Sequence, residues 1–210
     1  MAPAAPLLAI GLVGSLVMFA GDMLLYFTPG AYDMDGTLRP YARIMRDLPE
    51  GRVQLGGLLG PVAAFLYVVG FAGLPMLGMG ELPWLMWAVA ALLSFALVCG
   101  GAYHAQYPYL ALAARAGDEG LVGRVADSIM ALQRLATVPM YVAFVLLGVL
   151  VALGWTTLPQ WAVVLTPLVT SFLGFAWLRV PQPFRCVLFG GWSNLVLTIM
   201  FAAMLAFVLV

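Results

Sequence analysis

The feature that most constrains this chain is the recurrence of apolar stretches long enough to cross a membrane. A helix needs roughly 20 apolar residues to span a bilayer core about 30 Å thick. Stretches of that kind, separated by short polar breaks, cover residues 7–27, 55–77, 84–112, 138–153, 160–178 and 186–210. Backbone groups in lipid must be hydrogen-bonded within the protein, so each stretch is predicted to be a helix. The sequence thus predicts an all-α polytopic membrane helix bundle of about six transmembrane helices, in which residues 1–210 form a single integral membrane domain.

The composition supports lipid as the solvent for most of this surface. Of the 210 residues, 64% are hydrophobic and only 9% are charged, whereas a soluble domain carries about 25% charged residues. The formal net charge of zero argues against a nucleic-acid partner. The chain contains no lysine, which excludes a retinal or pyridoxal-phosphate Schiff base. A single histidine and two cysteines in apolar sequence argue against a zinc site, and we expect neither a metal nor another cofactor.

The positions of the arginines predict how the bundle is oriented. Every arginine falls within residues 30–53, 113–136 or 179–185. With an even number of spans, these segments share one side of the membrane, and both termini share the other. Positively charged loops are retained in the cytoplasm, so both termini are expected on the non-cytoplasmic side. Apolar residues recur at helical spacing over 121–136, which predicts a short amphipathic cytoplasmic helix before the fourth span.

Two ionisable side chains, Asp22 and His104, lie well inside predicted spans, in the half of the membrane next to the arginines. An ionisable group within a span is costly and is by default a candidate for a functional site. Histidine as a residue type exchanges protons near neutral pH, so the two side chains are a candidate catalytic acid–base pair.

Other polar and aromatic side chains reach the same depth. Tyr26 and Tyr107 follow Asp22 and His104 by about one helical turn, so each pair shares a helix face. We expect a polar cavity bordered by the first, second, third and sixth spans, with arginines at its mouth. Its predicted ligand-binding residues are Tyr26, Gln54, Tyr107, Trp192, Asn194, Arg46, Arg52 and Arg185.

These observations lead to one functional hypothesis and two alternatives. The hypothesis is that the protein binds, or acts by acid–base chemistry on, an amphiphilic or lipid-like small molecule in the cytoplasmic half of the membrane. One alternative is a transporter or channel for a small solute, in which Pro61, Pro167 and the glycines break helices. The other is a structural or accessory membrane subunit, in which Asp22 and His104 only pair with each other. Whether the protein is an enzyme, and its oligomeric state, stay open at this point.

Four short motifs carry a resemblance to a known family. They are Gly21-Asp22, Gly100-Gly-Ala-Tyr-His104, Pro181-Gln-Pro-Phe184 and Gly190-Gly-Trp-Ser-Asn194. In this order they resemble a family of bacterial six-span membrane proteins catalogued as a domain of unknown function. The resemblance implies a multi-pass protein of the bacterial cytoplasmic (inner) membrane. It also implies that Asp22, His104, Trp192 and Asn194 are motif positions, and it implies no activity.

Overall fold

The computed structural model describes residues 3–28, 37–79, 82–181 and 184–210, and its regular elements are helical. The α-helices are α1 (Ala4–Tyr26), α2 (Arg39–Asp47), α3 (Glu50–Phe71), α4 (Trp84–His104), α5 (Tyr107–Ala116), α6 (Glu119–Ala152), α7 (Pro167–Thr170) and α8 (Phe184–Leu209). Three 3-10 helices complete them: η1 (Leu74–Leu77), η2 (Gln160–Leu165) and η3 (Ser171–Arg179). An isolated β-bridge pairs Gly78 with Thr156. The predicted all-α fold is confirmed.

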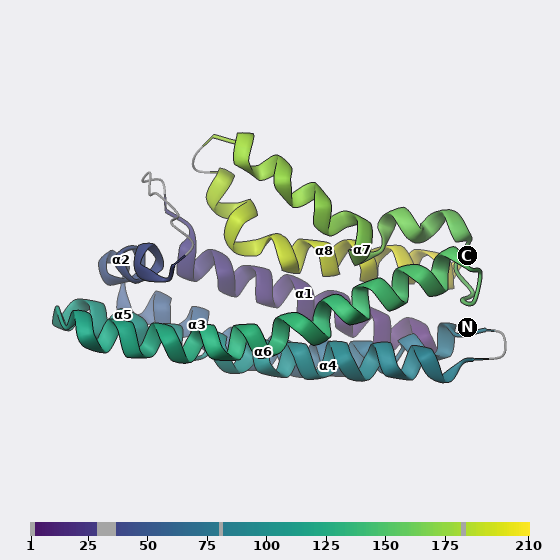
Figure 1. Ribbon diagram of the computed structural model, residues 1–210, viewed down its shortest axis with the longest axis horizontal. Helices are drawn as coiled ribbons and strands as arrows, with labels where there is room; N and C mark the ends of the chain where they lie inside the picture. The colour runs from purple at the N-terminus through teal and green to yellow at the C-terminus, as the bar shows by residue number, and fades with distance from the viewer. Residues whose placement is uncertain (1–2, 29–36, 80–81, 182–183) are drawn as a thin grey trace.

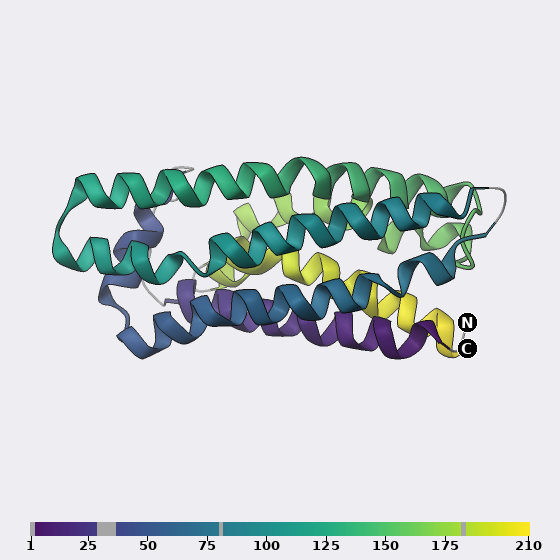
Figure 2. The ribbon, with the colours of Figure 1, turned by 90° about the horizontal axis from the view of Figure 1, so that it is seen from below.

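The long helices lie side by side along the length of the molecule (Figures 1 and 2). Helix α1 packs against α3 and α8, α3 packs against α4, and α4 packs against α6. The N- and C-termini lie at the same end of the bundle (Figure 1). Successive long segments therefore run in alternate directions, and the chain returns to the end at which it began.

Five helical stretches in the described residues are long and apolar enough to cross a membrane. They are Ala4–Tyr26, Glu50–Leu77, Trp84–Ala116, Glu119–Ala152 and Gly190–Leu209. Their outward side chains are apolar as well: Leu58, Phe65 and Val138 are each at least 65% exposed. So much exposed apolar surface is costly in water and favourable in lipid. The molecule is therefore built as a membrane-embedded helix bundle.

The predicted span over 160–178 is broken in the structure. Instead of one long helix, it consists of η2, the short α7 and η3. The break falls at Thr166, whose backbone is extended (φ −74°, ψ 154°), immediately before Pro167. Proline disfavours the helical conformation in the residue before it and cannot donate a backbone hydrogen bond, which explains the interruption. The helix is thus interrupted at Pro167, and the continuous helix expected over 160–178 is not present.

The short amphipathic helix expected over 121–136 is not a separate element. It is the first part of α6, a single helix of 34 residues that includes Pro139. Asp118 caps its start as an oxygen acceptor for the Leu121 amide, at 2.8 Å. Because a proline within a membrane helix can be accommodated by its neighbours, Pro139 does not end the helix. A further short helix, α2, lies between α1 and α3 in the sequence.

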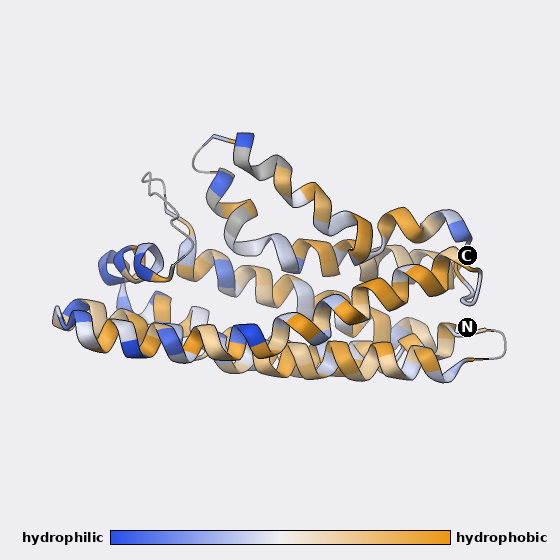
Figure 3. Ribbon diagram, in the orientation of Figure 1, coloured by the Kyte–Doolittle hydropathy of each residue, from blue (hydrophilic) through white to orange (hydrophobic). Residues whose placement is uncertain are grey.

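Polar and apolar residues separate along the bundle (Figure 3). Hydrophilic residues gather on α2, α5 and the start of α6, at the end opposite the termini. Two buried apolar clusters fill the interior. The larger includes Met18, Phe71 and Phe201, and the smaller, at the charged end, includes Leu25 and Leu110. The candidate site lies where these two clusters meet.

Candidate functional site

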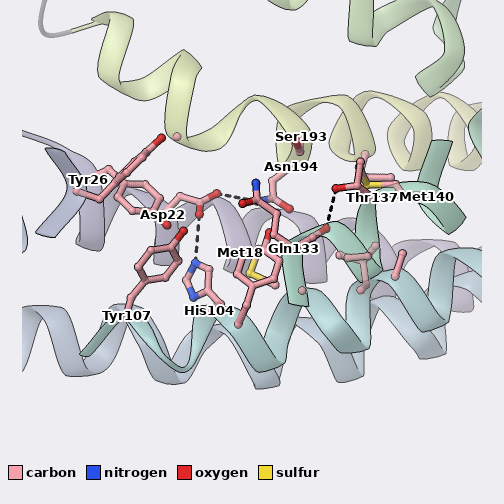
Figure 4. A pocket seen from close by; sticks show the side chains of 18 residues that line it. Met18, Asp22, Tyr26, His104, Tyr107, Gln133, Thr137, Met140, Ser193 and Asn194 are labelled. Atoms are coloured by element: carbon pink, nitrogen blue, oxygen red, sulfur yellow. Dashed lines mark hydrogen bonds and ion pairs between the residues drawn. The ribbon is translucent and has the colours of Figure 1, made fainter. Parts of the chain in front are cut away.

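A chain of buried polar side chains joins four helices, and Figure 4 shows its contacts of Asp22 with His104 and Asn194. His104 Nε2 on α4 is 3.1 Å from Asp22 Oδ1 on α1. Asn194 Nδ2 on α8 donates to Asp22 Oδ2 at 2.6 Å, and the Tyr67 hydroxyl on α3 donates to Asn194 Oδ1 at 2.8 Å. Each of these four side chains is buried. The predicted proximity of Asp22, His104 and Asn194 is therefore present, and Tyr67 is a partner that the sequence analysis did not identify.

The contacts of the imidazole indicate where its proton lies. His104 Nδ1 is buried and has no hydrogen-bond partner among the described residues. It faces α3, since a Cβ placed on Gly60 would lie 2.9 Å from it. A buried N–H without a partner is rarer and more costly than a buried lone pair without one. The favoured arrangement of a neutral imidazole is thus the tautomer whose Nε2–H donates to Asp22 Oδ1 and whose Nδ1 is a lone pair against α3.

Glycines allow the helices to approach each other closely at this point. A Cβ on Gly101 would lie 2.7 Å from the Ala64 Cβ, and one on Gly60 would lie 2.5 Å from the His104 Cβ. A Cβ on Gly190 would lie 2.5 Å from a ring carbon of Tyr26. Small residues at such contacts are typical of packed membrane helices. Gly101 and Gly190 belong to two of the motifs, and these contacts explain why a residue without a side chain stands at both positions.

A cavity of about 180 Å³ lies beside the Asp22–His104 pair. Its lining comes from α1, α2, α4, α5, α6 and α8. The lining residues are Met18, Asp22, Tyr26, Tyr41, Ala96, Leu97, Gly100, Tyr103, His104, Tyr107, Gln133, Ala136, Thr137, Met140, Gly190, Ser193, Asn194 and Leu197. Gln133 and Ser193 are exposed, so the cavity reaches the surface between α6 and α8. In Figure 1 the segment 171–179 and the start of α8 diverge from α6 toward the charged end of the bundle.

Four tyrosines form one wall of this cavity. The Tyr26 ring meets Tyr41 edge-on at 4.9 Å between centroids and Tyr107 at 5.4 Å. The Tyr107 ring also meets Tyr103 at 6.4 Å and His104 at 5.8 Å, again nearly at right angles. Such edge-to-face packing is favourable between aromatic rings. It produces a wall in which neighbouring rings stand roughly perpendicular to each other.

Several sequence-predicted residues do not belong to the cavity. Gln54 is exposed, and its amide donates to Glu50 on the same helix at 2.9 Å. Trp192 does not line the cavity; its indole N–H donates to the Ser171 carbonyl at 3.4 Å and ties α8 to η3. Sequence position gave these two side chains the right depth along the bundle, but the rotation of their helices turns them away from the cavity.

Two of the arginines predicted at the mouth of the cavity donate to backbone carbonyls and do not line it. Arg52 donates to the carbonyls of Leu24 at 2.8 Å, of Met23 at 3.0 Å and of Phe27 at 2.6 Å. Arg185 donates to the Val180 carbonyl at 3.0 Å. The last carbonyls of a helix have no partner within the helix, so a nearby guanidinium is a natural donor for them.

Arg46 faces a different cavity, at the charged end of the bundle. That cavity, of about 460 Å³, is lined by Arg39, Ala42, Arg43, Arg46, Ala114, Glu119 and Val122. Arg46 donates to the exposed Asp47 carboxylate at 2.9 Å. This hydrogen bond lowers the pKa of the Asp47 carboxyl below its ordinary value. Among the described residues, no arginine lines the cavity beside Asp22.

The border of the cavity also differs from the prediction. The second span, α3, contributes Tyr67 to the hydrogen-bond chain but no lining residue. Helix α6 takes its place through Gln133, Thr137 and Met140. Gln133 and Thr137 are one turn apart in a helix that becomes apolar after them. This pair of polar residues was the sequence feature that could have indicated that α6 lines the cavity. Gln182 and Pro183 of the Pro181–Phe184 motif lie outside the described residues.

The sequence matches the Family of unknown function (DUF6796) over residues 2–209. No curated protein and no solved structure matches the chain. The expected resemblance to a family of unknown function is thus confirmed at that level, and the match covers nearly the whole chain. This protein belongs to the family of unknown function DUF6796.

Proposed function

We propose that this protein is a multi-pass protein of the bacterial inner membrane that binds the polar head of an amphiphilic small molecule in the cytoplasmic half of the bilayer. The observation that carries the proposal is the cavity beside Asp22, which combines a buried carboxylate with an opening on the surface of an apolar bundle. In a membrane, that surface faces lipid.

The size of the cavity favours the end of a molecule over a whole one. Its volume of about 180 Å³ is smaller than the roughly 300–1,000 Å³ of sites that enclose drug-sized ligands. Gln133 and Ser193 mark the rim, and beyond them the surface of α6 is apolar, with Tyr141 and Val145 about half exposed. A polar head would occupy the cavity, and an apolar tail would lie against α6 among the lipid chains.

Acid–base chemistry is a natural extension of this binding role. Asp22 lines the cavity, and its carboxylate has one hydrogen bond to each oxygen. It keeps lone pairs with which it could accept a proton from a bound molecule. His104 would act through Asp22 as a positioning residue, because its second nitrogen faces α3 and not the cavity. The acid–base role therefore falls first on Asp22.

The proposed binding site in the cytoplasmic half of the bilayer requires a topology of six membrane crossings. The segment 160–179 is helical, although broken, and it packs against α6 and α8. Counting it as a crossing puts all the arginines on one side, which the positive-inside rule assigns to the cytoplasm. Both termini are then non-cytoplasmic, and the cavity beside Asp22 belongs to the inner leaflet.

Transport across the whole membrane has less support. The Phe71 ring stacks on Tyr67 and on Phe201, and the three rings have centroid distances of 5.3–6.1 Å, on the side of the site toward the termini. Beyond the Ser15–Thr198 hydrogen bond, the interior on that side is the larger apolar cluster. A solute leaving the cavity toward the termini would have to cross this apolar layer.

The test is to fill the cavity without removing a polar group. Gly100 lines the cavity, and a Cβ added there would meet nothing closer than 3.8 Å, so Gly100→Leu projects into open space. Gly123→Leu is the matched control, because that glycine lies on α6 outside the cavity with nothing within 4 Å of its Cβ position. The probe is a single-chain amphiphile with a photoreactive diazirine beside its head, added to the full-length protein in lipid nanodiscs.

We expect mass spectrometry to find saturable crosslinks to cavity residues such as Met18, Met140 and Leu197 in the wild type and in Gly123→Leu. Crosslinking should be lost in Gly100→Leu, while that variant stays as stable as the wild type. Equal crosslinking in all three proteins, or labelling spread evenly over the lipid-facing surface, would show that the cavity binds no amphiphile.

A further inference from the structure

The cavity contains the expected carboxylate of Asp22, but the arginines expected at its mouth do not line it. Of its lining residues, Asp22 alone carries a formal charge when His104 is neutral, and no arginine among the described residues joins it. The arginines nearest in sequence are engaged elsewhere, as Arg52 is with the carbonyls at the end of α1. An anionic head would therefore meet a buried carboxylate without a compensating cation.

We propose that the head group bound beside Asp22 is a cation, either a quaternary ammonium or a protonated amine, held by the Asp22 carboxylate and by the ring faces of Tyr26, Tyr41, Tyr103 and Tyr107. This inference rests on the proposed function and names the chemical class of its ligand.

The first reason to expect a cationic head group is the buried carboxylate of Asp22. Asp22 is 4% exposed, and its two hydrogen-bond donors, His104 Nε2–H and the Asn194 amide, are neutral groups in the favoured arrangement. Hydrogen bonds stabilise a buried charge but do not neutralise it. A protonated His104 would supply the missing positive charge, but it would bury an Nδ1–H against Gly60 with no acceptor. A cationic ligand supplies that charge without this cost.

The second reason to expect a cationic head group is the wall of tyrosine rings. Cations bind over the faces of aromatic rings, and walls built from several rings are a common way to recognise quaternary ammonium groups. Four rings line this cavity, and neighbouring rings stand at 69–82° to one another. Such an arrangement offers faces in more than one direction around a small, roughly spherical head.

The apolar lining agrees with this ligand class. Leu97, Met140 and Leu197 line the cavity on the side toward the larger apolar cluster. They supply apolar and polarisable contacts for the methyl groups or methylenes next to an ammonium nitrogen.

The experiment compares three amphiphiles that share one alkyl chain. The first has a trimethylammonium head, the second its uncharged isostere with a tert-butyl head, and the third a sulfate head. Each is titrated into the full-length protein in phosphatidylglycerol nanodiscs, and the Kd is measured. Because anionic lipid itself attracts a cationic amphiphile, partitioning into protein-free discs of the same lipid is measured for each amphiphile and subtracted before Kd values are compared.

The variants separate the charge from the rings. Asp22→Asn removes the charge at nearly constant shape, and exposed Asp127→Asn on α6 is its control. Tyr107→Leu removes a cavity ring, and Tyr109→Leu removes a ring that is 63% exposed on the same helix. Tyr107→Phe keeps the ring and loses only the hydroxyl.

We expect the wild type to bind the trimethylammonium amphiphile about tenfold more tightly than the uncharged one, a preference in the range of desolvated cation–π contacts. Asp22→Asn should abolish that preference, and Tyr107→Leu should weaken binding of the cation but not of the isostere. Tyr109→Leu and Asp127→Asn should stay within about threefold of the wild type, and Tyr107→Phe should bind the cation more tightly than Tyr107→Leu does. If Asp22→Asn fails to fold, the comparison of Tyr107→Leu with Tyr107→Phe decides whether the aromatic ring contributes to cation binding.

Two results would overturn the inference. Equal or tighter binding of the uncharged or sulfate amphiphile, still lost in Gly100→Leu, refutes a cationic head and leaves the proposed binding function intact. Binding of all three amphiphiles that Gly100→Leu does not affect refutes the proposed function itself.

Discussion

Asp22 and His104, 82 positions apart in the sequence, lie 3.1 Å apart in the interior of the bundle. One is a turn from the end of α1, and the other ends α4. Helices α1 and α4 each pack against α3. Asp22 therefore joins two helices that α3 also holds together, and the pair has both a structural and a chemical role.

This pair should be energetically coupled. Asp22→Ala leaves the donors of His104 and Asn194 without an acceptor, and each single alanine variant of the pair should cost about 1–3 kcal/mol of stability. The double variant should cost about 1 kcal/mol less than the sum, within the range found for hydrogen bonds in membrane proteins. A double-mutant cycle by reversible unfolding in mixed micelles measures this, and exposed Asp127→Ala serves as the control. Strict additivity of the two losses would contradict the contact.

The two adjacent glycines of the Gly100–His104 motif should tolerate alanine very differently. A Cβ at Gly101 would lie 2.7 Å from the Ala64 Cβ and 3.0 Å from the Gly60 carbonyl oxygen, whereas one at Gly100 meets nothing closer than 3.8 Å. Gly101→Ala should therefore destabilise the fold by about 1–3 kcal/mol, as overpacking does, and Gly100→Ala should be neutral or slightly stabilising. Thermal unfolding of both variants tests this. Combining Gly101→Ala with Ala64→Gly should restore much of the loss, and a failure to do so would point to another cause.

Arg52 should contribute to stability and not to ligand binding. Its guanidinium donates to three carbonyls at the end of α1, a pattern that the single ammonium of lysine cannot reproduce. Arg52→Ala should cost about 2 kcal/mol, and Arg52→Lys should recover only part of it. Hydrogen exchange should show faster opening of the last turn of α1 in both variants. Unchanged stability in Arg52→Ala, or a loss of amphiphile binding without a loss of stability, would argue for the binding role expected from the sequence.

The sequence was informative about depth along the bundle and poor about rotation around each helix. Apolar length placed the long helices, Pro167 located the break, and the cost of charge in lipid selected Asp22 and His104. Asn194 and Trp192 were expected in the same layer, yet only Asn194 lines the cavity. A helix that is apolar on all sides gives no amphipathic signal for which face is inward.

The arginines were misjudged for a related reason. Charge sets the side of the membrane on which a residue lies, but it does not say whether a guanidinium will reach a ligand or an unpaired backbone carbonyl. Arg52 and Arg185 reach carbonyls, and these partners depend on how the helix ends are placed in three dimensions. The role of α6 was missed because its first half has an amphipathic pattern typical of a surface helix, while Gln133 and Thr137 turn toward the cavity.

The topology gives the last prediction, and it separates six crossings from five. If 160–179 crosses the membrane, both termini lie on the non-cytoplasmic side; if it does not, they lie on opposite sides. Single cysteines are introduced at exposed Glu119 and Gln160 and after Val210, in a background without Cys99 and Cys186. Each variant is treated in intact cells with a membrane-impermeant maleimide, before and after permeabilisation. We expect Gln160→Cys and the C-terminal cysteine to react in intact cells, and Glu119→Cys to react only after permeabilisation, because the positive-inside rule assigns the arginine-rich segments to the cytoplasm. A C-terminal cysteine protected in intact cells while Gln160→Cys reacts would show that 160–179 does not cross. It would also mean that α8 starts on the non-cytoplasmic side, whereas the proposed position of the cavity in the inner leaflet requires α8 to start on the cytoplasmic side.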